Sequence, residues 1–102
     1  MANMNKGDSV MVIAGVKDVD IGTDLSGWRG RVASVYRDGT VAVEWDSLTL
    51  AAMGMDAIRQ ADEAGLDWMQ YVLNQSEVTL VPAADTEADV KAAIKRIAAQ
   101  LK

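Results

Sequence analysis

Alternating apolar and polar positions predict antiparallel strands in the first half of the chain. A run rich in β-branched residues follows a turn at residues 6–8 and predicts a first strand over residues 10–13. Second and third strands are expected over residues 28–36 and 41–45, joined at Asp38-Gly39, which is a strong hairpin signal. Between the first two strands, residues 16–27 carry aspartates and glycines and predict a long polar loop.

The pattern within these strands also predicts which side chains are buried. The third strand alternates cleanly, and its inward-facing residues are expected to be Val41, Val43 and Trp45. In the second strand Val32 and Val35 cannot share a face of a regular strand, which predicts a bulge or a strong bend near Ala33-Ser34.

Helix formers dominate the middle of the chain. Residues 55–64 show helical spacing, and Gly65 is a suitable stop just past the last turn. Residues 67–73 fit either a helical turn or a strand. Residues 77–82 predict a further strand that is ended by the only proline, Pro82.

The clearest helix is expected near the end of the chain. Thr86 and Asp89 have the spacing of a capping box, with Asp in place of the preferred Glu. One face of this helix is apolar, and its residues are Val90, Ile94, Ile97 and Leu101. Burying each of these side chains is worth about 1.5–3 kcal/mol, so the stripe must be covered by this chain, by a second copy in a homodimer, or by another protein.

Composition removes several classes of function. The chain of 102 residues has no cysteine and no histidine, so thiolate chemistry, disulfides, and the commonest general base and metal ligand are absent. The serines have no histidine to activate them, and no phosphate-binding glycine loop is present. A net charge of −5 disfavours a nucleic-acid partner. The expectation is a protein that is not an enzyme and that binds no cofactor and no metal.

Targeting signals are also missing from the sequence. No apolar run approaches the roughly 18 residues of a membrane span, and residues 1–10 lack the apolar core of a signal peptide. We therefore expect a cytoplasmic protein with no membrane partner.

Three sequence motifs together resemble a known family. They are KGDSVMV at residues 6–12, GWRGRV at 27–32 and DGTVAVEW at 38–45, and they resemble the small Src-homology-3-like (SH3-like) barrels of the KOW and Tudor type. The resemblance covers roughly residues 5–48, with EVTLV at 77–81 as the closing strand. The chain is also similar to bacterial small-barrel proteins that insert a helix before their last strands.

This resemblance implies a mainly β fold: an SH3-like barrel of about five strands over residues 1–83. Two features depart from the simpler barrel families: a long helical insertion at about 51–74, and an extra amphipathic C-terminal helix over residues 84–102, packed on the barrel or on a partner. It also implies a binding role, since KOW-type relatives bind RNA or proteins, and Tudor-type relatives bind methylated side chains in aromatic cages.

The leading functional hypothesis is a non-catalytic binding or adaptor module for a protein or peptide. The candidate binding residues lie at the end of the polar loop, with an aromatic anchor beside polar groups: Trp28, Arg29 and Arg31, with Asp20 and Asp24 opposite them. Trp45 is expected in the core because it alternates with valines.

Three alternatives stay open at this point. Nucleic acid of the KOW type would be bound by Arg29, Arg31, Arg37 and Tyr36, unless these arginines are an outward face balanced by Glu44 and Asp46. An accessory subunit of an enzyme complex would dock through the C-terminal stripe. The aspartates at 18, 20 and 24 superficially match a calcium loop, but the ligand positions of an EF-hand are not met.

Overall fold

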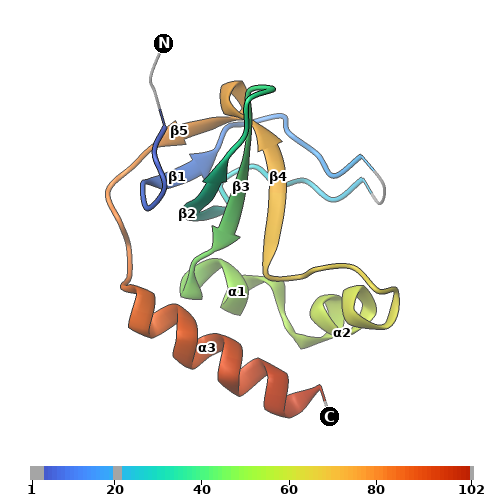
Figure 1. The fold of residues 1–102 in the computed structure, drawn as a ribbon. Helices are drawn as coiled ribbons and strands as arrows, with labels where there is room; N and C mark the ends of the chain where they lie inside the picture. Colours follow the sequence, from blue (N-terminus) through green and yellow to red (C-terminus); the bar gives the residue numbers. More distant parts are fainter. Residues whose placement is uncertain (1–3, 20–21, 102) are drawn as a thin grey trace.

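A computed structural model describes residues 4–19 and 22–101, and its centre is one antiparallel sheet. The described strands are β1 (Ser9–Val12), β2 (Arg29–Val35), β3 (Thr40–Trp45), β4 (Gln70–Asn74) and β5 (Val78–Leu80), in the spatial order β4-β3-β2-β1-β5. The helices are α1 (Ser47–Met53), α2 (Met55–Glu63), α3 (Glu87–Gln100) and a short 3₁₀ helix, η1 (Gln75–Glu77). Figure 1 shows the α-helices gathered at one end of the sheet.

The chain is thus a small domain of mixed α/β structure in which the sheet dominates, as expected. The hairpin between β2 and β3 turns at Asp38-Gly39. The predicted bulge in β2 is confirmed, because the β2–β3 register shifts between Val32 and Ser34.

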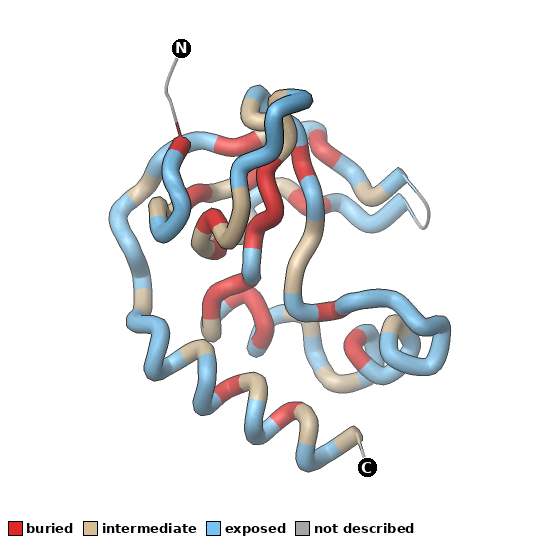
Figure 2. Tube along the Cα trace, viewed as in Figure 1, coloured by how far each residue is buried: buried red, intermediate tan, exposed pale blue. Residues whose placement is uncertain are grey.

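The core is built from buried side chains of all five strands together with α1, α2 and α3, and buried segments run along the strands as well as the helices (Figure 2). The three side chains predicted to face inward from β3 are all buried; they are Val41, Val43 and Trp45. Ala42, on the opposite face, is buried as well.

A helix that the periodicity did not indicate, α1, begins directly after β3. The Asp46 carboxylate caps it by accepting a hydrogen bond from the Thr49 N–H at 2.8 Å. The backbone of Arg29 in β2 holds this turn from the other side: its N–H donates to Thr49 Oγ1 and its carbonyl accepts from the Asp46 N–H. Asp46 is therefore a buried helix cap, and it does not balance the arginines of β2.

The helical insertion has different bounds from the expected 51–74. Helices occupy residues 47–63, with a break at Gly54, whose φ of 80° ends α1 before α2 begins. The predicted helix over 55–64 is confirmed as α2, and Gly65 follows its C-cap. The ambiguous residues 67–73 resolve as a turn followed by β4, because Tyr71 and Leu73 pair with Val43 and Val41 of β3.

The C-terminal helix covers this chain's own core. The predicted capping box is present in both directions between Thr86 and Asp89. On the apolar stripe, Ile97 is buried, and the other members are partly buried against the core; they are Val90, Ile94 and Leu101. The structure thus shows the apolar stripe of α3 covered by this chain itself. A dimer through the same helix stays a prediction.

One ionic cluster fastens the segment before α3 to the sheet. The Arg31 guanidinium forms an ion pair with the Asp85 carboxylate at 2.9 Å and also donates to the Asp85 backbone carbonyl. The second carboxylate oxygen of Asp85 accepts from the N–H of Ser47 at 2.7 Å and from its hydroxyl at 2.6 Å. Because the Asp85 side chain is only 5% exposed, β2, α1 and the start of α3 are joined at a nearly dry point.

Opposing effects act on the pKa of the Asp85 carboxyl. Burial favours the neutral acid and would raise the pKa, but the hydrogen bonds from Ser47 and the charge and hydrogen bond of Arg31 favour the carboxylate. The balance holds the pKa of Asp85 below its ordinary value of 3.8. Its contribution to stability is therefore present above pH 3.8 and is lost as the pH falls through the lowered value.

We predict that Asp85→Asn lowers the free energy of unfolding at neutral pH by about 2 kcal/mol, because Arg31 loses its buried partner. The difference in the free energy of unfolding between wild type and variant should narrow only below pH 3.8, as the wild-type carboxylate becomes protonated. Urea denaturation at neutral pH and at several pH values below 3.8 measures this gap. Asp56→Asn is the matched control, since Asp56 is fully exposed and lies 4.0 Å from Arg59. A gap that is independent of pH would contradict the role of this carboxylate.

A second prediction concerns Gly30 in β2, where the backbone of β3 leaves no room for a side chain. A Cβ at this position would lie 2.1 Å from the backbone oxygen of Glu44. We expect Gly30→Ala to cost about 3 kcal/mol of stability, because the two central strands must move apart. Gly65→Ala, at a positive φ in open space, should cost only about 1 kcal/mol. Denaturation that gave equal losses for both variants would argue against this close approach.

Candidate functional site

Four of the five aromatic residues line a single hollow beside β4. This aromatic hollow has a volume of about 470 Å³, and its lining residues include Trp28, Trp45, Trp68 and Tyr71. Aliphatic residues and methionine complete its apolar wall, among them Leu25, Met53 and Leu66. Its size falls in the usual range of ligand pockets, which are mostly apolar with a few polar groups.

Backbone pairing fixes the two central rings. Trp28 follows the turn at Gly27, and its carbonyl accepts a hydrogen bond from the Val12 N–H in β1 at 2.8 Å. Trp45 ends β3 and pairs in register with Gly30. The two indoles meet edge to face, with ring centroids 5.1 Å apart and an interplanar angle of 81°. This arrangement is favourable for aromatic pairs and holds both rings in place.

The other two rings come from the segment after α2. Trp68 lies in the turn that leads into β4 and is buried. Tyr71 is in β4 itself, opposite Val43, and is partly buried. The helical insertion thus forms one wall of the aromatic hollow and β3 and β4 form another.

The charged residues in the described lining of this hollow are acidic. They are Asp18 and Asp67, and the lining residues that the structure describes include no lysine or arginine. The Asp67 carboxylate accepts a hydrogen bond from the Met69 N–H at 2.9 Å, which fixes its position in the turn before β4. Aromatic faces together with carboxylates suit a cation or an apolar group and disfavour an anion.

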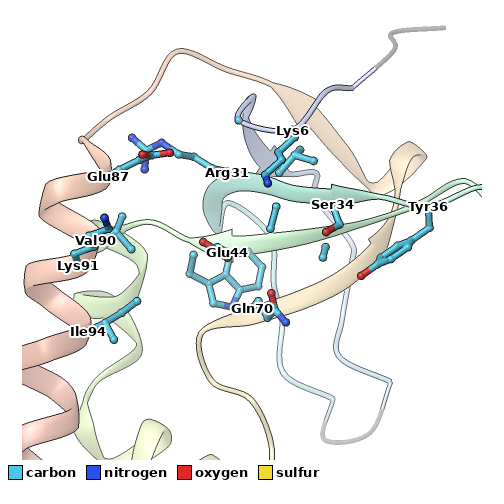
Figure 3. A pocket seen from close by; sticks show the side chains of 15 residues that line it. Lys6, Arg31, Ser34, Tyr36, Glu44, Gln70, Glu87, Val90, Lys91 and Ile94 are labelled. Atoms are coloured by element: carbon cyan, nitrogen blue, oxygen red, sulfur yellow. The ribbon is translucent and has the colours of Figure 1, made fainter.

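A second hollow of about 480 Å³, the polar groove, lies between α3 and the sheet. Figure 3 shows Glu44 and Gln70 on neighbouring strands of its floor, with Val90 and Ile94 on the α3 side. Its charged lining is mixed in sign and consists of Lys6, Arg31, Glu44, Glu87 and Lys91. Trp45 and Gln70 line both hollows, so they separate the polar groove from the aromatic hollow.

The structure separates the candidate binding residues that the sequence suggested. Trp28 lines the aromatic hollow, whereas Arg31 lines the polar groove and is engaged by Asp85. Arg29 lines neither hollow, and its guanidinium donates to the Pro82 carbonyl at 2.6 Å. A single groove joining Trp28 to both arginines is therefore not formed, because residues 28 and 29 point to opposite faces of β2 and its arginines hold the linker to α3.

Of the two loop aspartates proposed for binding, only Asp24 lies among the described residues. Asp24 pairs with Lys17 in an isolated β-bridge, and its carboxylate accepts from the Ser26 N–H at 2.9 Å. Hydrogen bonding from Ser26 is the main cause that lowers the pKa of Asp24. Asp20 lies outside the described residues. Within residues 4–19 and 22–101, no group of three or more acidic side chains is placed to hold a metal ion.

Trp68, Tyr71 and Asp67 were not among the residues that the sequence singled out for binding. Composition could have drawn attention to the two aromatic residues, since aromatic residues are only 5% of the chain and phenylalanine is absent. What sequence reasoning lacked was the return of β4 along β3, which carries residues 68–71 back to Trp28 and Trp45.

Comparison of the chain with protein-family models, curated proteins and solved structures found no match. A search of the described helices for a long apolar segment that could cross a bilayer gave none.

Acrylamide quenching can test how open the aromatic hollow is to a small solute. In three variants that each retain one tryptophan, the others being replaced by phenylalanine, we expect Trp28 to be quenched most readily. Trp45 and Trp68 should be shielded, since they are only 3% and 8% exposed. Equal quenching of all three would contradict the burial of Trp45 and Trp68, and shielding of all three would mean that the hollow is closed to solutes.

Proposed function

We propose that this protein is a non-catalytic binding module that recognises a peptide or a segment of another protein through its aromatic hollow. The observation that carries this proposal is the convergence of Trp28, Trp45, Trp68 and Tyr71 on one hollow of about 470 Å³. Tryptophan and tyrosine are enriched among residues that dominate binding energy, because they offer a large rigid surface at low cost in conformational entropy.

The partly exposed Trp28 is the proposed contact residue at the mouth of the hollow. Trp45 and Trp68 are too deeply buried to offer more than an edge, so they support Trp28 and shape the floor. The ring of Trp28 packs on the core and on Trp45, which fixes its orientation before a partner arrives. Preorganisation of this kind reduces the entropy lost on binding.

The KOW-type alternative loses support because its bases are engaged. Arg29 and Arg31 are bound to the linker before α3, which removes two of the three proposed arginines from a phosphate-binding face. Phosphate contacts by lysine and arginine supply most of the affinity for nucleic acids. The net charge of −5 acts in the same direction.

We also propose that the sheet has the fold of an SH3-like barrel. Two features support it: β5 pairs back onto β1, and the 3₁₀ helix η1 lies directly before β5. The order β4-β3-β2-β1-β5 is the order expected for such a barrel when it is opened between its outer strands.

Selection from random linear peptides displayed on phage tests the proposed function. We expect wild-type protein to enrich a common sequence, and Trp28→Leu to bind the enriched peptides at least about tenfold more weakly, as loss of an aromatic anchor predicts. Leucine keeps apolar bulk beside Trp45, whereas alanine would leave a cavity there.

The matched control is Leu48→Ala, since Leu48 is 57% exposed on α1 and lines neither hollow. Circular dichroism and thermal unfolding should show that both variants remain folded. Failure to enrich any sequence, or enriched peptides that bind folded Trp28→Leu as tightly as wild type, would overturn the proposed function.

A further inference from the structure

The polar groove is hollow because the sheet residues beneath it are small. In β2, the register shift places one extra residue, Ala33, between Val32 and Ser34. Arg31 and Ser34 therefore share the outer face of the sheet, although residues three apart in a regular strand point to opposite faces. Ala42 of β3, the partner of Ser34, adds only a methyl group to this floor. These short side chains account for the volume of about 480 Å³.

A row of three polar side chains crosses the floor of the groove. Arg31, Glu44 and Gln70 are paired in register on β2, β3 and β4, so they point to the same face of the sheet. The Arg31 guanidinium lies opposite Glu44 in this register, but its ion pair is with Asp85. Within residues 4–19 and 22–101, the Glu44 carboxylate thus forms no ion pair, and neither it nor the Gln70 amide forms a side-chain hydrogen bond.

Helix α3 supplies the facing wall of the groove. Its lining residues are spaced by three and four positions, as neighbours on one helix face are: Glu87, Val90, Lys91 and Ile94. Val90 and Ile94 are partly buried and give this wall its apolar surface. Figure 3 shows Lys91 on the α3 side of the groove and Lys6, from the turn before β1, on the sheet side. The groove thus combines an apolar wall with charged groups at its rim and floor.

The charges that remain available in the groove are balanced. Arg31 is engaged by Asp85, and the four other charged side chains of the lining form no ion pair within the described part of the chain: Lys6, Lys91, Glu44 and Glu87. Two bases and two acids give no net charge, although the whole chain carries −5. An anion alone would meet both carboxylates, and a cation alone would meet both lysines. A ligand that carries both charges can place each against its opposite.

We infer that the polar groove binds a small zwitterion with an aliphatic side chain, the class of the free α-amino acids. The ligand's ammonium group lies against Glu44 and Gln70 on the floor, and its carboxylate lies at the rim beside Lys91. Its side chain packs on Val90 and Ile94 of α3. An apolar wall with a few convergent polar groups is the usual build of a small-molecule site. The inference goes beyond the proposed function, because it concerns the polar groove and a different ligand.

L-Leucine is the probe, and its binding to the full-length protein is followed by amide chemical shifts at neutral pH. We expect saturable shifts at Ala33, at Ala42 and at the side-chain amide of Gln70, with a Kd of about 1 mM or below. Two analogues each remove one charge: isocaproate lacks the ammonium group, and isoamylamine lacks the carboxylate. Each should bind at least about tenfold more weakly than leucine, because one charge-assisted contact is lost.

Variants test the same contacts from the protein side. Glu44→Gln removes the carboxylate charge at nearly constant shape and should weaken leucine binding at least about tenfold, and Lys91→Gln should weaken it in the same direction. The matched controls are Glu63→Gln and Lys95→Gln, at positions that line neither hollow, and they should bind leucine as wild type. All four substituted side chains are exposed, so thermal unfolding should show folded variants.

Several results would overturn the inference. No saturable shift up to about 10 mM leucine would exclude the site. Equal affinity for either analogue would exclude a zwitterion as the ligand, and unchanged affinity in Glu44→Gln would show that leucine binds elsewhere. Shifts confined to the aromatic hollow, at Met53 and Leu66, would do the same. Trp28→Leu should bind leucine as wild type, so failure of the proposed function and failure of this inference are distinguishable.

Discussion

The close pairing of Gly30 with the end of β3 is the constraint on which the rest of the structure depends. Because Gly30 has no side chain, the backbone of Glu44 approaches β2 to a distance that no Cβ would permit. This approach places Trp45 against Trp28. It also brings Asp46 to the carbonyl of Arg29, where α1 begins. One missing side chain therefore positions the aromatic pair, the helical insertion and the aromatic hollow that they enclose.

Alternate side chains of β2 point to opposite faces of the sheet and make different contacts. Trp28 and Val32 face the core, while Arg29 and Arg31 face the linker that carries α3. The ion pair of Arg31 with Asp85 is nearly buried, so it depends on the added hydrogen bonds from Ser47 to offset desolvation. The result is that Arg29 and Arg31 hold the linker that leads to α3.

Local signals in the sequence predicted local structure well. The bulge in β2, the capping box at Thr86 and the stop at Gly65 each depend on residues that are neighbours in the chain, and each is present. The helix α1 was not predicted, although its Asp46 cap lies next to it in the chain. The part that the sequence does not reveal is the contact of the Arg29 N–H with Thr49, twenty residues away. The helical insertion was drawn too long because the pairing of β4 with β3 is a long-range contact that periodicity does not reveal.

The same limit applied to the candidate site. The sequence identified Trp28 at the loop–strand junction, but it grouped that residue with arginines that are close in the chain and lie on the other face of β2. It assigned Trp45 to the core, where the ring is buried. It did not bring Trp68 and Tyr71 to the same hollow, because that requires the path of the chain through both helices of the insertion.

Trp45 lines both the aromatic hollow and the polar groove. An occupant that displaced this ring from one side would reshape the other side at the same time. Such an occupant would link the two hollows thermodynamically, and the linkage would be reciprocal: each occupant would change the affinity for the other by the same factor. Among the described residues, Trp45 and Gln70 form the wall that the two hollows share, so two occupants would lie only one layer of side chains apart.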